Sequence, residues 1–265
     1  MRTVDVFDSL RVKKSTAFIG YLPAGFPTVE KSIEAVRTLA DSGADIIEIG
    51  LPYSDPTMDG LTIQQATEES LAHGFRTRDI FSIVEACADS GALPLVMSYY
   101  NPLFKYGFTD FARDLDNAGG AGIITPDLVP EEACLWYEAS DAYNLDRIFL
   151  AAQTSTSERL KKIVKASRGF VYAASTMGVT GTRVAMDERA RGLVKRVREA
   201  GADNVCLGIG VSTSHQAKDV ASYADGVIVG SALVKTLMNE SWSDSLESLK
   251  ETATMLSLAI HENEK

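Results

Sequence analysis

The chain has 265 residues and is 45% hydrophobic, which is enough apolar side chain for one large core. Its formal net charge is −10, and a negative surface repels nucleic acids and anionic membranes, so neither is an expected partner. The sequence has no apolar run near the ~18 residues of a membrane span and no signal-peptide core at its start, so we expect a cytoplasmic protein.

Eight short stretches are predicted to form β-strands. Each is apolar and rich in isoleucine, valine or leucine, and runs that are apolar on both faces suit parallel strands covered by helices. In chain order, the predicted strands are residues 17–22, 45–50, 93–100, 122–127, 147–152, 169–175, 204–210 and 225–231.

Amphipathic segments between these strands are predicted to form helices. Residues 29–43 place Ile33, Val36 and Leu39 along one face, and the segment ends in glycine. A glycine that ends a helix directly before a strand is typical of the joint between repeated β/α units. The other helical segments are residues 62–74, 77–91, 109–120, 157–169 and 186–201.

This alternation predicts an α/β fold, a closed (β/α)8 or TIM barrel. Eight such units fit into about 250 residues. No linker rich in serine, glycine or proline divides the chain, so residues 1–265 are expected to form a single domain. Residues 4–11 are predicted to form an extra N-terminal helix that closes the bottom of the barrel, and residues 243–260 a final helix.

Glu48 lies inside an apolar strand, where an acid is unexpected. Side chains alternate along a strand, so Ile47 and Ile49 share one face and Glu48 points from the other. If the isoleucines pack against helices, Glu48 faces the barrel mouth, where partial desolvation raises its pKa and suits a proton donor. The alternative is an internal ion pair that stabilises the barrel.

Two further acids, Asp55 and Asp59, follow in the loop after this strand. An aspartate before proline or glycine is most often a turn residue. Asp59 can also be interpreted as a catalytic acid that works with Glu48, because two carboxylates in different environments can divide two proton-transfer roles.

Glycines end the last two predicted strands. Gly208 and Gly210 end one of them, and Gly230 and Ser231 lie where the other gives way to a short helix. In a (β/α)8 barrel, the loops after strands seven and eight form a recurrent phosphate site whose donors are backbone amides. The pattern predicts a phosphate-bearing ligand, to which Gly181 in the loop after strand six can add a third amide.

Four tyrosines fall at or near the carboxyl ends of predicted strands. Ordinary barrel packing explains any one of them, whereas a group around an apolar mouth suits a flat aromatic ligand. They are Tyr21, Tyr99, Tyr100 and Tyr172.

Cysteine and histidine indicate neither a disulfide nor a metal site. Cys87 and Cys206 lie in apolar runs, where the expected state is a small buried hydrophobic side chain, and Cys134 is distant from both. The three histidines have no second ligand at metal-binding spacing, so no metal is expected.

Several stretches of the sequence match one known family. They are AFIGYLPAGFP, GADIIEIGLPYSDPTMDGLTIQ, MSYYNPLFKYG, ITPDLVPEE, SRGFVY, GVTGTR, GIGVST and ADGVIVGSALV. The second is highly specific, because it combines a strand-end Glu, a P-[FY]-S-D-P turn, a D-G and an I-Q in order. Through these stretches, the chain resembles the tryptophan synthase alpha chain family over nearly its whole length. The resemblance implies a lyase that cleaves indole-3-glycerol phosphate to indole and glyceraldehyde 3-phosphate in a retro-aldol-type step.

The resemblance also implies roles for individual residues. Glu48 matches the principal acid–base residue, and Asp59 matches the second acid, which accepts the indole N–H. Thr180 matches a loop residue that closes over the site and meets this second acid. The implied substrate and phosphate contacts are Tyr172, Thr180, Gly181, Gly210, Gly230 and Ser231.

The family has a partner, a pyridoxal-phosphate-dependent beta chain, in an αββα heterotetramer through which indole passes in a tunnel. The resemblance therefore implies no cofactor in this chain, and it places Pro52 and Asp55 in a partner-facing loop. The sequence departs from the family pattern at Met58 and Leu61, near the second acid, and at Thr176, after strand six.

Two alternatives remain open from the sequence. One is another enzyme on the same scaffold, such as a phosphosugar isomerase or indole-3-glycerol-phosphate synthase. None of the eight predicted strands contains a lysine, which argues against the synthase, whose acid step uses one. The other is a catalytically weak barrel that mainly binds and activates a partner.

Overall fold

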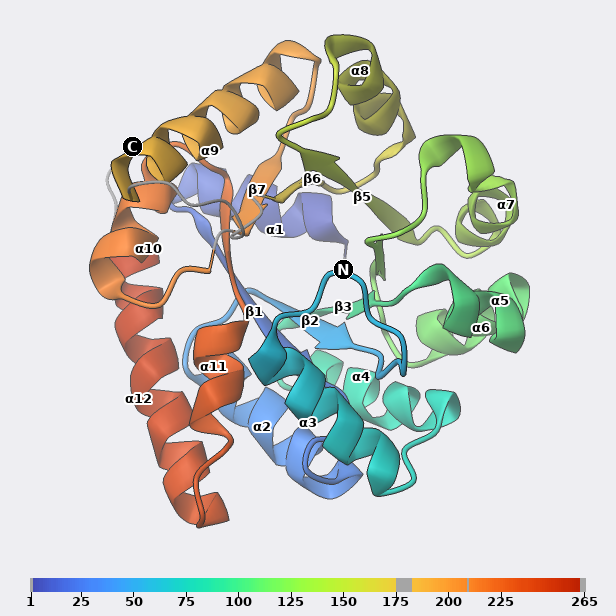
Figure 1. Ribbon diagram of the computed structural model, residues 1–265, viewed down its shortest axis with the longest axis vertical. Helices are drawn as coiled ribbons and strands as arrows, with labels where there is room; N and C mark the ends of the chain where they lie inside the picture. Colours follow the sequence, from blue (N-terminus) through green and yellow to red (C-terminus); the bar gives the residue numbers. More distant parts are fainter. Residues whose placement is uncertain (1, 175–182, 209, 263–265) are drawn as a thin grey trace.

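The computed structural model describes residues 2–174, 183–208 and 210–262. Eight parallel strands form a closed barrel in chain order, and pairing of the last strand with the first closes it (Figure 1). This confirms the predicted (β/α)8 fold. The strands are β1 (Ala17–Pro23), β2 (Ile46–Gly50), β3 (Leu93–Met97), β4 (Gly122–Thr125), β5 (Asp146–Ala152), β6 (Val171–Ala174), β7 (Val205–Gly208) and β8 (Gly226–Val229).

The helices form a ring around the strands, while α1 crosses the inside of that ring (Figure 1). In chain order they are α1 (Thr3–Val12), α2 (Val29–Asp41), α3 (Leu61–Ala72), α4 (Ile80–Asp89), α5 (Tyr100–Tyr106), α6 (Phe108–Asn117), α7 (Cys134–Ala142), α8 (Ser157–Ala166), α9 (Arg183–Glu199), α10 (Ser214–Ala221), α11 (Ser231–Thr236) and α12 (Trp242–His261). Two short 3-10 turns, η1 (Thr77–Asp79) and η2 (Pro130–Glu132), precede α4 and α7.

Glycines end several helices at the joints that the sequence predicts. Gly43, Gly119 and Gly201 follow α2, α6 and α9, and all three have positive φ angles, of 95°, 82° and 104°. Only glycine adopts this left-handed conformation without a steric penalty, so each residue turns the chain from its helix into the next strand.

The extra N-terminal helix, α1, closes the bottom of the barrel as predicted. Phe7 and Leu10 of α1 pack in one apolar cluster with Ile19 and Ile46, whose side chains point into the barrel. The backbone N–H of Thr3 donates to the carboxylate of Asp146 at 3.1 Å, and its hydroxyl donates to the same oxygen. Asp146 begins β5, so α1 is bonded to the amino ends of the strands.

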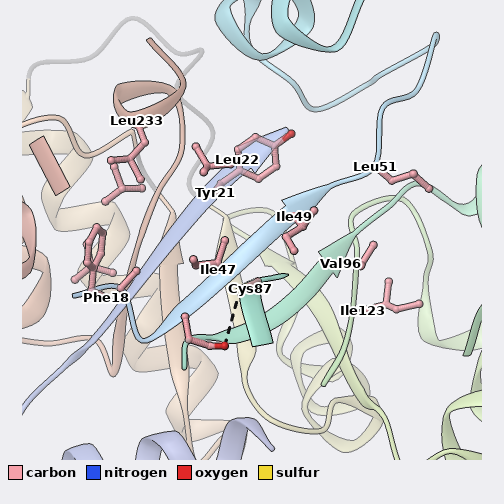
Figure 2. Packing of buried hydrophobic residues seen from close by; sticks show 14 of the residues in the cluster. Phe18, Tyr21, Leu22, Ile47, Ile49, Leu51, Cys87, Val96, Ile123 and Leu233 are labelled. Carbon is pink, nitrogen blue, oxygen red and sulfur yellow. Dashed lines mark hydrogen bonds between the residues drawn. The ribbon is translucent and has the colours of Figure 1, made fainter. Parts of the chain in front are cut away.

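The main core lies between the strands and the surrounding helices. Ile47 and Ile49 of β2 are fully buried in it together with Phe18 and Leu22 of β1 and Leu233 of α11 (Figure 2). Ile19 and Ile46, which point inward from the same two strands, belong to the other cluster. This division fixes which face of β2 points into the barrel.

Candidate active site

Glu48 points into the barrel mouth from the middle of β2. Its neighbours Ile47 and Ile49 pack against the helices, and strand alternation therefore turns Glu48 inward. The side chain is 0% exposed, and within the described part of the chain neither carboxylate oxygen has a hydrogen-bond partner. Desolvation by this burial raises the pKa of Glu48 to about 8.

A cavity of about 520 Å³ opens above Glu48 at the carboxyl ends of the strands. Its apolar wall comes from Ile63, Met97, Leu150 and Ile228. The cavity brings together six residues to which the resemblance gives catalytic or substrate-binding roles, which are Glu48, Asp59, Tyr172, Gly210, Gly230 and Ser231. A mouth with an apolar wall and a few convergent polar groups is the usual form of a small-molecule site.

Asp59 lies in the loop between β2 and α3, on the rim of this cavity. The hydroxyl of Tyr99 accepts a hydrogen bond from the Met58 backbone N–H at 3.0 Å and also hydrogen-bonds the Asp59 carboxylate. The side chain of Gln64 donates to the Asp59 carbonyl oxygen at 2.7 Å. Burial raises the pKa of Asp59, and the bond from Tyr99 opposes this shift. These bonds hold the acid over the mouth.

Tyr21 of β1 and Tyr172 of β6 border the cavity together with Glu48, and Tyr21 is the neighbour of Glu48 in the β1–β2 ladder. Burial raises the pKa of both phenols well above the usual value, and the Glu48 carboxylate raises them further. Both side chains therefore stay protonated at neutral pH, and both line the cavity.

The predicted phosphate loops also border the cavity. Gly210 follows β7 with a φ of 73°, and Gly230 caps α11, which Ser231 begins. The side-chain oxygen of Gln216 accepts from the backbone N–H groups of Ser212 and Thr213, at 2.9 and 3.2 Å, which orders the chain between β7 and α10. Thr180, Gly181 and Thr176 lie outside the described residues.

Comparison of the sequence with known proteins shows the family of this chain. The profile of the tryptophan synthase alpha chain family matches residues 7–261. The tryptophan synthase alpha chain of Bifidobacterium longum is 53% identical over 248 residues, 92% of this chain and 85% of that protein. The chain belongs to the tryptophan synthase alpha chain family.

Solved structures of tryptophan synthase share this fold. A structure of Mycobacterium tuberculosis tryptophan synthase has a TM-score of 0.91 at 51% identity and covers 98% of both chains. The tryptophan synthase subunit alpha of Legionella pneumophila has a TM-score of 0.89 at 29% identity, again with 98% of both chains covered. The barrel is therefore retained as sequence identity falls.

Members of the tryptophan synthase alpha chain family cleave indole-3-glycerol phosphate in tryptophan biosynthesis, so this chain is a carbon–carbon lyase. The alpha chain pairs with the beta chain in the tetramer; pyridoxal phosphate belongs to the beta chain, and the alpha chain uses no cofactor. This membership decides between the lyase and the other enzymes of the same scaffold.

Several residues outside the cavity also have predicted roles. Asp55 is exposed, whereas Pro52, expected to face the partner, is buried. Cys87 and Cys206 are fully buried, which confirms their assignment as small apolar side chains, and Cys134 is exposed. Within the described ranges, no group of three His, Cys, Asp or Glu residues is placed to hold a metal, and no helix has the length and apolar character to cross a membrane.

Tyr99 is a residue beside this alpha-chain site that the sequence does not single out for a specific role. Tyr99 counted only as one of four tyrosines near strand ends, and its contact with the Asp59 loop spans 41 positions in the chain. The available signal was topological, because the carboxyl ends of β2 and β3 are adjacent in the barrel.

Proposed function

We propose that Glu48 carries out both proton transfers of indole-3-glycerol phosphate cleavage. Its protonated carboxyl group donates to the indole carbon that bears the glycerol chain. The carbon–carbon bond then breaks as the adjacent hydroxyl becomes an aldehyde, and the Glu48 carboxylate takes the proton that this hydroxyl loses. The group ends the cycle protonated again, so no outside acid or base is required.

One observation carries this proposal: Glu48 is buried at the floor of the cavity with no described protein partner for either oxygen. A buried acid in an internal ion pair would have a cation beside it, whereas burial alone sets the pKa of Glu48 near 8. At pH 7, Glu48 therefore carries the proton that the reaction needs in most of the molecules.

Asp59 is proposed to accept the indole N–H and to stabilise the positive charge that develops on the protonated ring. This role requires the ionised form. Burial raises the pKa of Asp59, and the Tyr99 hydroxyl counteracts the shift by hydrogen-bonding the carboxylate. The proposed roles need Asp59 ionised and Glu48 protonated, and of the two carboxylates only Asp59 has a described hydrogen-bond donor.

The phosphate of the substrate is proposed to bind the backbone at Gly210, Gly230 and Ser231. These residues border the same cavity as Glu48, on the two last strands, and glycine allows close approach of the phosphate to backbone amides. Tyr172 is proposed to contact the substrate between the phosphate and Glu48. The family pattern adds Thr180 and Gly181 to this set.

The partner-facing surface is proposed to include Asp55 and the exposed apolar side chains on neighbouring elements. Phe104 of α5 is 57% exposed and stacks on Tyr100, and Leu135 of α7 is 44% exposed. Pro52 is buried and contributes by shaping the loop that leads to Asp55.

The cellular location proposed for this lyase is the cytoplasm.

The decisive experiment is Glu48→Gln, which keeps the size of the side chain and removes its acid–base function. Loss of a general acid–base group costs about 10²–10⁴-fold, so we expect indole release to fall by at least 100-fold. The exposed Glu247→Gln in α12 is the matched control and keeps full activity.

Assays with and without a beta chain complete the test. We expect the Glu48→Gln protein to keep the wild-type circular dichroism spectrum, which checks its fold. We also expect it to bind a substrate analogue without hydroxyl groups, an indole ring joined to a propyl phosphate. A variant that keeps a tenth of the wild-type rate contradicts the assignment of Glu48. A wild-type chain that releases no indole under either condition supports a purely binding and activating barrel.

A further inference from the structure

Gly50 makes room for the ring of Tyr21. A Cβ atom added to Gly50 would lie 2.6 Å from both Cε2 and Cζ of Tyr21, and closer still to the phenol oxygen. Real Cβ atoms show no contact this short with an aromatic ring. The backbone of Gly50 is not among the described left-handed glycines, so the constraint at this position comes from the tyrosine ring, which a larger residue would have to displace, and not from the φ angle.

The same arrangement recurs on the opposite side of the mouth. A Cβ atom on Gly208 of β7 would lie 2.6 Å from the phenol oxygen of Tyr172 and 3.0 Å from its Cε1 atom. Gly208 likewise has no positive φ angle. Two tyrosines on separate strands thus each lean over an inward-facing glycine on the next strand along the barrel.

The Gly50–Tyr21 pair lies directly beside Glu48. Tyr21 and Glu48 are register partners in the β1–β2 ladder, and Gly50 follows Glu48 by two residues on the same face of β2. Figure 2 shows Tyr21 at the carboxyl end of β1, beside the end of β2 that carries Ile49. A ring that leans from Tyr21 over Gly50 therefore lies beside the Glu48 side chain, and both side chains line the cavity.

We propose that Gly50 and Tyr21 are positioning residues for Glu48: the glycine leaves the space that allows the tyrosine ring to shield the carboxyl group from water. The inference rests on the proposed role of Glu48. It accounts for two facts together, the complete burial of an acid at the edge of an open cavity and the absence of a side chain at Gly50.

The described residues around the cavity offer no cation as a competing explanation for the state of Glu48. The titratable groups that share its surroundings are Tyr21 from β1, Tyr172 from β6, Cys206 from β7, Tyr99 from the segment after β3 and Asp59 from the loop after β2. Among the described residues that line the cavity, none is lysine, arginine or histidine. Exclusion of water is then what keeps Glu48 protonated, and burial is the cause of its raised pKa.

The test compares Gly50→Ala and Tyr21→Ala with two controls. Both variants admit water to Glu48, the first by displacing the ring and the second by removing it. The pKa of Glu48 then falls toward its ordinary value. Because the acid must be protonated, turnover is lost as pH rises through this pKa, so the basic limb of kcat moves to lower pH. A fall of one to two pH units corresponds to a rate loss on the order of tenfold near pH 8.

The controls separate shielding from general damage. Tyr21→Phe keeps the ring, so it keeps the wild-type basic limb. Gly192→Ala in α9 places a methyl group where nothing lies within 4 Å, so it leaves the pH profile unchanged. Carbon-13 NMR of the glutamate carboxyl groups reports the pKa of Glu48 directly, and Glu48→Gln identifies its signal by removing it.

The two proposals fail in different ways. If Glu48→Gln retains turnover, the proposed function is wrong. If Glu48→Gln is inactive but Gly50→Ala and Tyr21→Ala keep the wild-type basic limb and carboxyl titration, only the shielding role is overturned. Tyr21→Ala adds no atoms to the barrel, so it still tests the inference if Gly50→Ala does not fold.

Discussion

Two buried carboxylates occupy opposite ends of the barrel, and they differ in their partners. Glu48, at the carboxyl ends of the strands, is 0% exposed and has no described hydrogen-bond partner. Asp146, at the amino ends, is 1% exposed and accepts from the backbone and the hydroxyl of Thr3. Burial raises the pKa of both acids.

The difference lies in what opposes the burial. The backbone N–H of Thr3 lowers the pKa of Asp146, and the positive charges of Arg2 and Arg168 lower it further. No described residue acts on Glu48 in this way, and desolvation is the cause of its shift. A buried acid with donors stabilises the fold, whereas one without them holds a proton that a substrate can take. The comparison separates the structural end of the barrel from its chemical end.

The largest effect is expected for Asp59→Asn. Asp59 has one hydrogen-bond donor, from Tyr99, and is in this respect intermediate between Glu48 and Asp146. Asparagine keeps the shape but not the charge that stabilises the protonated indole. We expect kcat to fall on the order of 100-fold, the scale of one lost electrostatic contact to a transition state. Steady-state indole release measures the loss, with the exposed Asp116→Asn in α6 as the matched control. Wild-type kinetics for Asp59→Asn would reduce this residue to a turn-former.

A smaller effect, and one on stability instead of rate, is expected at the other end of the barrel. Thr3→Val keeps the branched shape of the side chain and removes one of the donors to the buried Asp146 carboxylate. Leaving a buried acceptor short of a partner costs about 1–3 kcal/mol, so the free energy of unfolding falls by that amount. Denaturant unfolding measures it, and Thr254→Val, exposed on α12, is the control.

The kcat of Thr3→Val tests whether the amino ends of the strands have a purely structural role. Thr3→Val is expected to keep its wild-type kcat at a temperature where it is folded, because α1 lies at the amino ends of the strands and the cavity at the carboxyl ends. A change in kcat without a change in stability would remove the distinction between the two ends.

The sequence predicts the barrel well because its signals are local. The predicted strands and the observed ones agree to within a few residues at each end, since apolar runs and glycine joints report directly on buried parallel strands. Residues 93–100 are the informative exception: β3 ends at Met97, and Tyr100 already begins α5. The Asp127 carboxylate accepts from the Tyr100 backbone N–H at 2.8 Å and fixes this helix start from another loop.

In the site, too, local signals are predictable from the sequence, and contacts between separate segments are not. Alternation along one strand was enough to turn Glu48 inward, because its neighbours Ile47 and Ile49 are apolar. The contact of Tyr99 with the Asp59 loop and the space that Gly50 leaves for Tyr21 depend on side chains from adjacent strands. No spacing within one segment encodes such pairs, so they emerge only when the barrel closes.

A shift in the pH profile, with no loss at the pH optimum, is expected for Tyr99→Phe, which tests whether one donor is enough to separate Asp59 from Glu48 in protonation state. The Tyr99 hydroxyl stays protonated, because burial raises its pKa to about 12, and its bond lowers the pKa of Asp59. Without it the pKa of Asp59 rises. Since Asp59 acts ionised, turnover is lost as pH falls through this pKa, and the acidic limb of kcat moves to higher pH.

The magnitude and the pattern of this shift distinguish positioning from packing. A single hydrogen bond to a charged group is worth about 1.5–3 kcal/mol, so the acidic limb of kcat moves by about one to two pH units, while the basic limb set by Glu48 stays in place. Phenylalanine preserves the ring that packs at 5.4 Å from Tyr53, which keeps the local core intact. An equal loss at every pH would instead show that Tyr99 acts on the loop around Met58 alone, without tuning the acidity of Asp59.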